Sequence, residues 1–300
     1  DDVPANALWG IHTKRAVMNF PITGVPVGHF PEFVRALALV KQAAARANKR
    51  LGYLAAEKAD AIDKACTKVA TDKVYAESFV VDAIQGGAGT STNMNANEVI
   101  ANVALKLMGK KPGDYHTLHP NDDVNMAQST NDAYPTAIRL GLLLGHDSLL
   151  SALEKLIQSF ASKGLEFGHV LKMGRTQLQD AVPMTLGQEF TAFGANLAEE
   201  QRTISGAADS LLEVNLGATA IGTGINTPSG YKDQVVAALR EVTGLDIQAS
   251  PDLIEATSDT GGYVMMHSAI KRAAMKLSKI CNDLRLLSSG PRAGLNEINL

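Results

Sequence analysis

Three long segments of helical periodicity constrain the fold of this chain more than any other feature. They cover residues 136–167, 184–216 and 262–288, and few helix-breaking residues interrupt them. A helix of about 25–30 residues spans roughly 40 Å, which exceeds the usual helix length in globular proteins. Helices of this length bury their apolar faces against one another. The chain is therefore predicted to form an elongated helical bundle that is shared between subunits.

The last of these segments has the clearest pattern, because its apolar residues recur at intervals of four and three. The predicted buried face consists of Ile270, Ala274, Leu277, Cys281 and Leu284, with Ala273, Ile280 and Leu287 beside them. The opposite side is polar and carries Lys271, Lys276, Lys279 and Asp283. This separation is typical of a bundle helix with one face in the core.

The chain before these segments has shorter elements that glycine and proline interrupt. Helical periodicity predicts helices from Pro31 onward, over residues 55–73 and over 97–107. We therefore predict a mostly α protein with two domains. Residues 1–130 would form a small mixed N-terminal domain with carboxylate-binding loops, and 131–300 a central helical-bundle domain that is incomplete at its C-terminus.

Composition excludes several classes of function. Of the 300 residues, 45% are hydrophobic and 20% charged, and the net charge of −3 provides no basic patch for nucleic acid. No apolar run reaches the 18 residues that a membrane-spanning helix needs. The two cysteines, Cys66 and Cys281, are too few for a disulfide framework. These observations favour a cytoplasmic protein with neither nucleic acid nor membrane as a partner.

The most polar stretch of the chain is Gln128-Ser129-Thr130-Asn131-Asp132, which directly precedes an apolar helical run. Asn, Asp, Ser and Thr are common at helix N-termini because they bond nearby backbone groups. Five such residues in a row exceed what one cap requires. Neutral donors at a helix N-terminus, where the helix dipole also favours negative charge, predict an anion-binding loop.

Three further polar loops lie between the helical segments. Residues 86–95 combine glycines with hydroxyl groups, which fits either carboxylate binding or a flexible hairpin. In residues 174–180, Arg175 could hold an anion or pair with an acid such as Asp180. The glycines of residues 217–226 most simply mark a return between two bundle helices, with Thr223 and Asn226 as weak candidates for substrate contact.

A metal site is not expected in this chain. His116 and His119, followed by Asp122 and Asp123, have a spacing that zinc ligands can have. However, no compact helix is predicted to present them, and the His-Glu-x-x-His pattern is absent. The four polar loops, which are rich in donors and poor in bases, therefore carry the predicted chemistry.

In the sequence of these polar loops, the chain resembles the aspartase/fumarase superfamily of lyases, and within it the aspartases, or aspartate ammonia-lyases. The similar stretches are GGAGTSTNMNANEVIAN (86–102), HPNDDVNMAQSTNDAYPTA (119–137), KMGRTQLQDAVPMTLGQEF (172–190), GATAIGTGIN (217–226) and LSSGPRAGLNEINL (287–300). The resemblance implies a homotetramer with one long central bundle and active sites shared between subunits. It also implies reversible elimination of ammonia from L-aspartate to give fumarate, without an organic cofactor.

The resemblance assigns a role to each candidate site residue. Thr90, with Ser91 beside it, and Ser129-Thr130 would bind the β-carboxylate of the substrate. Thr90, Ser129 and Thr130 would stabilise the aci-carboxylate that forms when the Cβ proton leaves. Asn131 and Thr176 would hold the amino-acid end, with Gln177 beside them.

Two departures from the family pattern bear on function. Fumarases and some aspartases have a histidine where this chain has Gln177, and fumarases tend to have SGTQSN where this chain has AGTSTN. Both differences favour aspartate over malate as substrate. The family's general base is a serine in a mobile loop that resembles GSSxMPxKxNP, and residues 1–300 do not contain such a loop. This chain alone is therefore expected to be inactive.

Two alternatives to ammonia elimination stay open. One is fumarase-type hydration of fumarate to L-malate, and the other is a non-catalytic helical scaffold. The intact polar loops favour an enzyme, since a scaffold has no need of Ser129, Thr130 and Asn131.

Overall fold

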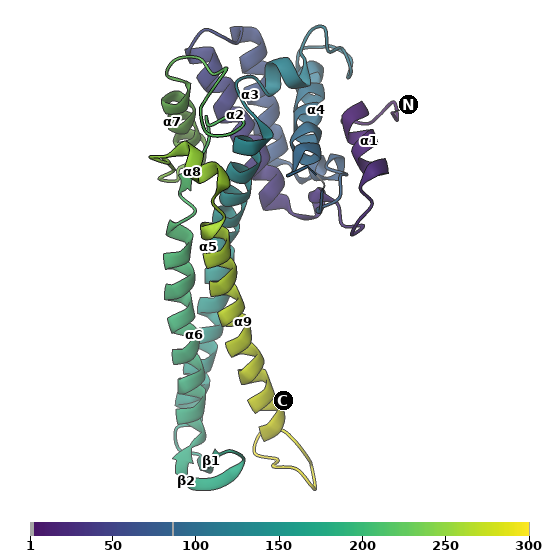
Figure 1. Ribbon diagram of the computed structural model, residues 1–300. Helices are drawn as coiled ribbons and strands as arrows, with labels where there is room; N and C mark the ends of the chain where they lie inside the picture. Colours follow the sequence, from purple (N-terminus) through teal and green to yellow (C-terminus); the bar gives the residue numbers. More distant parts are fainter. Residues whose placement is uncertain (1–2, 86, 300) are drawn as a thin grey trace. The chain divides into compact units, whose positions relative to one another are not determined.

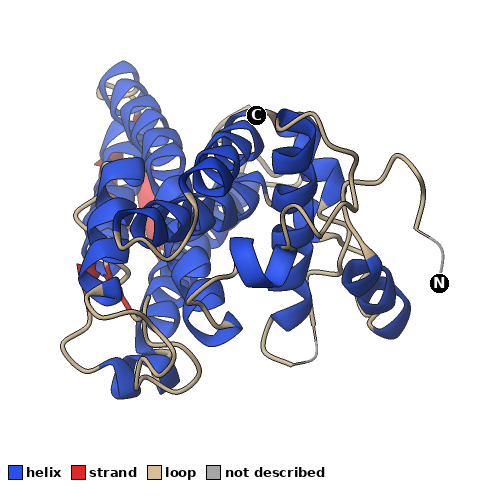
Figure 2. Ribbon diagram, turned by 90° about the horizontal axis from the view of Figure 1, so that it is seen from above, coloured by secondary structure: helices blue, strands red, loops and turns tan. Residues whose placement is uncertain are grey.

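The computed structural model describes residues 3–85 and 87–299, and helices make up most of them (Figure 2). The prediction of a mostly α protein is confirmed. The helices are α1 (Ile11–Asn19), α2 (Pro31–Arg50), α3 (Ala56–Thr71), α4 (Thr90–Leu107), α5 (Thr130–Glu166), α6 (Leu186–Asp209), α7 (Tyr231–Thr243), α8 (Leu253–Ser258) and α9 (Gly261–Leu287). Three further short turns of helix are η1 (Val27–His29), η2 (Lys73–Ser78) and η3 (Pro120–Val124).

Strands are few and short. Strand β1 (Leu171–Thr176) pairs antiparallel with β2 (Gln179–Thr185), and β3 (Glu213–Val214) pairs parallel with β4 (Gln248–Ala249). Along the described ranges, no helix is both long and apolar enough to cross a membrane.

The chain forms two compact units, and each contains two separate segments. The first unit comprises the residues up to 145 together with 211–259, and the second comprises 146–210 together with the residues from 260 onward. Helix α5 begins in the first unit and ends in the second. The division between residues 130 and 131 remains a prediction, but a linear division cannot express that residues 211–259 return to the first unit.

Helix α2 lies at the centre of the first unit and packs against α3 and α7 (Figure 1). Pro31 occupies its first turn, where a missing N–H costs nothing, and Lys49 and Arg50 lie in its last turn, where the dipole favours positive charge. Between these ends α2 is almost completely buried. Its core contributions include Val34, Ala36, Leu37, Ala38, Leu39, Val40, Ala43, Ala44, Ala45 and Ala47.

A buried carboxylate joins α4 to the start of α1. Glu98 of α4 accepts hydrogen bonds from the backbone N–H groups of Gly10 (2.7 Å), His12 (3.0 Å) and Thr13 (3.2 Å). The Thr13 hydroxyl adds a bond of 2.7 Å. These are the N–H groups that have no partner within a helix, so Glu98 caps α1 from a distant part of the sequence.

In the second unit, α6 and α9 run alongside each other (Figure 1). Helix α6 begins with a capping box, in which Gln188 N–H donates to the Thr185 hydroxyl and Thr185 N–H donates to the Gln188 side chain. Glu200 of α6 is completely buried and accepts two bonds from Arg272, at 2.7 and 2.8 Å, and a contact from Lys276 at 2.6 Å. This ion pair fixes α9 against α6.

The buried face of α9 differs from the predicted one. Ile270 and Cys281 are exposed, whereas Met266, Ala269, Ala273, Ile280 and Leu287 are buried. The observed row follows intervals of three, four and seven, and its alanines allow close approach to α6. Both rows are apolar, so periodicity alone could not choose between them. In the predicted row, Ile270, Ala274 and Cys281 are exposed, whereas Leu277 and Leu284 are half-buried.

Element boundaries also differ from expectation. Helix α4 begins at Thr90, so residues 90–95 of the predicted loop over 86–95 belong to its first turns. Helix α6 ends at Asp209 rather than near 216, and part of the remainder forms β3. The loop predicted at 174–180 is a β-hairpin. Gly86 lies outside the described residues.

Candidate active site

The polar stretch 128–132 forms the turn that leads into α5. Two side chains cap this turn: Asn131 N–H donates to Ser129 Oγ (3.2 Å), and Ser129 N–H donates to Asp132 Oδ1 (2.9 Å). The ordinary capping role is therefore present. It does not use the hydroxyl of Thr130 or the side chain of Asn131.

The second carboxylate oxygen of Asp132 holds the loop 217–226. It accepts the backbone N–H groups of Gly217 (3.2 Å) and Thr219 (2.9 Å). Burial raises the pKa of Asp132 to about 6, although these bonds and that from Ser129 oppose the shift. Thr219 has a φ of 57°, which is strained for a β-branched residue and is maintained by this carboxylate.

Asn131 attaches the same loop to the start of α5, and Pro135 leaves the carbonyl of Asn131 free to accept a bond from outside the helix. A proline has no N–H, so Pro135 cannot donate to the carbonyl of Asn131 four residues earlier. The side chain of Asn215 donates to that carbonyl instead, at 3.0 Å. The Asn131 side chain donates to the carbonyl of Ala220 at 2.7 Å. The loop therefore lies on the start of α5, between β3 and α7, and its prediction as a return between two bundle helices is wrong.

The first turn of α4 lies beside the first turn of α5. The Asn93 amide donates to the hydroxyl of Thr130 at 3.2 Å. Gly89, with a φ of 87°, packs so closely on Tyr134 that an added Cβ would lie 2.6 Å from its ring. Glycine is required there for both reasons. Two helix N-termini, each with its partial positive charge, thus meet around Thr130.

The predicted hydroxyl residues of the first unit lie on these two turns. Thr90 is exposed and donates to the carbonyl of Gly87 at 2.8 Å. Ser91, Ser129 and Thr130 are half-buried. Hydroxyl groups, helix N-termini and amides of this kind can bind a carboxylate and stabilise additional negative charge on it.

Sequence reasoning missed the charge beneath these turns. Lys41 of α2 is completely buried, and its ammonium donates to Asn93 Oδ1 (2.6 Å), Asn125 Oδ1 (2.8 Å) and Gln128 Oε1 (2.9 Å). Burial lowers the pKa of Lys41 to about 7, and the nearby carboxylate of Asp132 opposes the shift. A lysine within the apolar face of α2 was the available signal, since such a position otherwise calls for an aliphatic residue.

Thr176 and Gln177 lie in the β-hairpin of the second unit and are exposed. Gln177 and Leu178 connect the strands with φ values of 50° and 66°, the geometry of a type I′ turn. Residues other than glycine, asparagine and aspartate rarely take this conformation, which costs about 1–3 kcal/mol per residue. Strain of this size is typical of functional segments.

Arg175, in the same hairpin, pairs with acids, as one of its two interpretations predicted. Its main partner is Glu297, and Asp180 lies 3.8 Å away. Glu297 also contacts Lys172 at 3.0 Å. Lys172 and Arg175 border a hollow of about 310 Å³ that Gln177 also lines.

His119 has a structural role. Its Nδ1 accepts the backbone N–H groups of Asn121 (3.2 Å) and Asp122 (3.1 Å), and so caps the short helix η3. Among residues 3–85 and 87–299, no group of three or more His, Cys, Asp or Glu side chains is placed to hold a metal ion.

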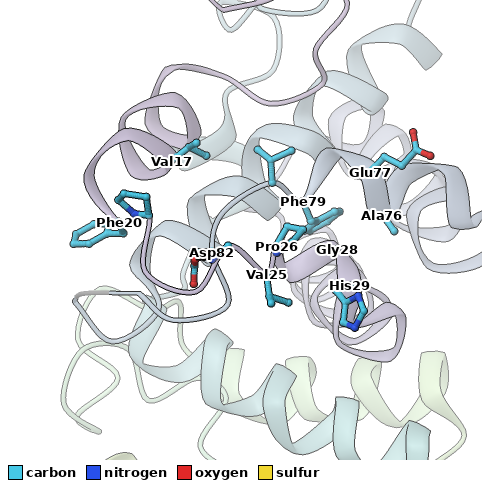
Figure 3. Close-up of a pocket in the computed structure, with 13 residues that line it drawn as sticks. Val17, Phe20, Val25, Pro26, Gly28, His29, Ala76, Glu77, Phe79 and Asp82 are labelled. Carbon is cyan, nitrogen blue, oxygen red and sulfur yellow. Dashed lines mark hydrogen bonds between the residues drawn. The ribbon is translucent and has the colours of Figure 1, made fainter.

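A separate cavity of about 590 Å³ lies in the first unit, between the end of α1 and η2 (Figure 3). Its lining is mostly apolar and includes Val25, Pro26 and Phe79. The Asp82 carboxylate at its edge is already occupied by the backbone of Thr23 (2.7 Å) and Gly24 (2.8 Å). None of the predicted site residues lines this cavity.

Comparisons with known proteins agree on one family. Residues 2–300 match the model of a family described as "Lyase". Aspartate ammonia-lyase of Corynebacterium glutamicum is 62% identical over 298 residues, which are 99% of this chain and 57% of the relative. The chain thus spans less than two thirds of the length of this curated relative.

Two solved structures have the same fold. The structure of fumarate lyase:delta crystallin from Brucella melitensis bound to cobalt aligns with a TM-score of 0.96 at 54% identity, over 99% of this chain and 64% of that chain. Class II fumarase from Schistosoma mansoni aligns with a TM-score of 0.89 at 32% identity, over 97% and 64%.

Proposed function

Because this chain belongs to the aspartase/fumarase superfamily of lyases, we propose that the protein eliminates ammonia from L-aspartate to give fumarate, reversibly. The observation that carries the proposal is the meeting of two helix N-termini around the Thr130 hydroxyl, above a buried ammonium. This arrangement suits a substrate whose carboxylate gains negative charge during the reaction.

In the proposed reaction, Thr90, Ser91, Ser129 and Thr130 bind the β-carboxylate. A base removes the proton from Cβ, and the electron pair of that bond moves into the carboxylate to form an aci-carboxylate. Hydroxyl groups that donate to its oxygens stabilise this intermediate more than the substrate, which lowers the barrier.

The second half of the reaction breaks the bond between Cα and nitrogen. The electron pair returns from the aci-carboxylate to form the double bond of fumarate, and the protonated amino group leaves as ammonia with the electron pair of the Cα–N bond. We assign Asn131, Thr176 and Gln177 to the amino-acid end of the substrate. Asn131 is exposed, and one of its amide N–H groups already anchors the loop at Ala220.

The base is proposed to be a serine supplied from outside these 300 residues. The chain covers 57% of the Corynebacterium relative, so the relatives have ample sequence for such a loop. A polypeptide that ends at Leu300 should accordingly give no detectable fumarate. Turnover by a preparation whose intact mass matches that polypeptide would contradict this assignment of the base.

A homotetramer with active sites shared between subunits is part of the proposal. Helix α9 exposes large apolar side chains, with Val264 61%, Met265 56% and Met275 65% exposed. Apolar surface of this kind on a long helix is typical of an interface. In the proposed tetramer, neighbouring subunits would cover these three side chains.

The two alternatives are weaker. Identity is 62% to an aspartate ammonia-lyase and 32% to a class II fumarase, which favours ammonia over water as the leaving group. A non-catalytic scaffold would not need a buried lysine beneath a row of hydroxyl groups, since such a charge is costly to bury.

The test is fumarate formation from L-aspartate and, separately, from L-malate, by the full-length protein with its intact mass recorded. We expect rapid turnover of L-aspartate only. Turnover of L-malate alone would establish the hydratase instead. Inactivity on both substrates, in a protein of full mass and native assembly, would favour the scaffold.

A further inference from the structure

The buried ammonium of Lys41 has all its hydrogen-bonding capacity engaged. An ammonium has three N–H donors, and the three acceptors within 2.9 Å are side-chain amide oxygens of Asn93, Asn125 and Gln128. No acidic side chain contacts it directly among the hydrogen bonds and ion pairs of the described residues. Lys41 therefore acts on neutral groups, and its effect on them is orientation.

The ammonium decides which way the Asn93 amide faces. With Oδ1 held 2.6 Å from Lys41, the NH₂ group must point the other way. It donates to Asn125 Oδ1 at 3.1 Å and to Thr130 Oγ1 at 3.2 Å. A reversed amide would place its NH₂ against an ammonium, which has no acceptor. The positive charge therefore allows only one orientation.

This orientation has a consequence for the Thr130 hydroxyl. A hydroxyl has one hydrogen to donate and two lone pairs that accept. Because Thr130 Oγ1 accepts from Asn93, its own hydrogen is not used in that contact and can be directed at a bound anion. An amide oxygen in the same place would attract that hydrogen and turn it away from the substrate.

We propose that Lys41 is a positioning residue, which orients Asn93 so that the Thr130 hydroxyl donates its hydrogen to the substrate carboxylate. The inference rests on the proposed function, in which Thr130 binds that carboxylate. Lys41 itself does not touch the substrate. Its contribution reaches the reaction through the chain of contacts from Lys41 to Asn93 and from Asn93 to Thr130.

Energetics argue against a purely structural role. Lys41 lies on α2 among Leu37, Val40 and Ala44, all completely or almost completely buried. Burying a lysine costs free energy that an aliphatic residue at this position would not cost, and replacing buried charges by apolar residues is often stabilising. Burial does lower the pKa of Lys41, yet three amide oxygens face it, an arrangement that favours the charged form. A lysine suits this position because its three neighbouring amide oxygens accept the hydrogen bonds that an ammonium donates.

A double-mutant cycle tests the inference. Lys41→Met, Thr130→Ala and the double variant are prepared in the full-length protein, and kcat and KM for L-aspartate are measured with folding checked by circular dichroism. Lys41→Met should lower kcat about tenfold or more, with a smaller change in KM, because a misdirected donor weakens the transition state. The double variant should be no slower than Thr130→Ala alone, since Lys41 acts through Thr130.

Independent losses that multiply in the double variant would overturn the inference, because a general disturbance of the fold does not depend on Thr130. Lys58→Met is the matched control. Lys58 donates to both carboxylate oxygens of Asp123, at 2.9 and 2.8 Å, and neither residue contacts Thr130. Its kcat should stay within about twofold of the wild type.

A second variant protects the test against misfolding of Lys41→Met. Asn93→Leu has nearly the same shape as the wild type, keeps the charge of Lys41 and removes the bond to Thr130. Asn93→Leu should also lower kcat about tenfold or more. The double variant Asn93→Leu, Thr130→Ala should be no slower than Thr130→Ala alone. A wild-type kcat in Asn93→Leu would overturn the inference with the proposed function intact. A wild-type protein that forms no fumarate from L-aspartate would overturn both.

Discussion

The two units of this protein solve the problem of burial in opposite ways. In the first unit, α2 is surrounded by its own chain, and buried polar groups such as Lys41 and Asp132 have partners from other segments. In the second unit, α9 buries one apolar row against α6 and leaves another exposed. The core around α2 is formed by its own chain. The second presents surface that, we propose, other subunits cover.

Because of this difference, substitutions in the buried polar network and substitutions of exposed apolar residues should have different consequences. A buried polar network depends on every member, so a single substitution in the first unit should disturb the site or the fold. Exposed apolar side chains do not add to the stability of the unit that contains them. Substitutions there should leave the unit folded and act on assembly.

The largest expected effect is on assembly. Met265→Lys together with Met275→Lys would place two unpaired charges in the proposed helix interface, which is strongly unfavourable. We expect the tetramer to dissociate and activity to be lost, because the proposed sites need several subunits. Sedimentation velocity and turnover of L-aspartate measure the two results.

Tyr53→Lys is the control for this pair, because Tyr53 is equally exposed, at 61%, but lies in the first unit. Its assembly and activity should be unchanged. A Met265→Lys, Met275→Lys variant that sediments like the wild type would show that these two methionines of α9 do not lie in an interface.

The next largest effect concerns the site of the first unit. Thr130→Ala removes a hydroxyl that is proposed to donate to the aci-carboxylate. Loss of one such donor typically lowers kcat by about 10²–10³. Thr71→Ala on α3 is the matched control, since that hydroxyl only donates to the carbonyl of Thr67. If Thr130→Ala raised KM and left kcat unchanged, Thr130 would bind substrate and transition state equally.

A smaller effect is expected on the pH dependence of the free energy of unfolding, to which the buried Lys41 of the first unit contributes. Lys41 has a pKa of about 7 in the folded protein and an ordinary value of 10.5, so between these values the unfolded chain binds more protons. The free energy of unfolding should therefore rise with pH from about 7 toward 10.5, by a few kcal/mol at most. The other charged or titratable groups that act on Lys41 are Asp132 and Cys66.

Urea unfolding at pH 7, 8 and 9 measures this slope, and Lys41→Met supplies the comparison. The variant should lose the part of the slope that Lys41 contributes, since methionine does not titrate. Equal slopes in the wild type and the variant would mean that the pKa of Lys41 is not lowered by burial.

Much of the architecture could be predicted from the sequence, because helical periodicity is a local property. Residues 262–288 predicted α9 to within a residue at each end, and Pro31 marked the start of α2. The row of α9 that packs on α6 could not be predicted, since Ile270 and Ala273 belong to adjacent rows that are both apolar. The choice depends on which helix lies opposite.

The candidate site divides in the same way. Ser129 and Thr130 were singled out because polar residues just before a helical run form a local pattern, whereas Thr90 was assigned through the family resemblance. Lys41 and Asn93 were missed as a pair because 52 residues separate them in the chain. The roles assigned to all of these candidate site residues, Thr176 and Gln177 included, stay predictions.

Taken alone, the sequence determined that this protein is built from helices, that its polar loops lie between them, and that these loops belong to one family. Local periodicity and short motifs are sufficient for that, because they depend on neighbours along the chain. Only the tertiary structure decided that the loop at 217–226 bonds to Asp132, and that a buried lysine orients the amide beside Thr130. Contacts between distant segments depend on packing, and packing is settled by the whole core at once.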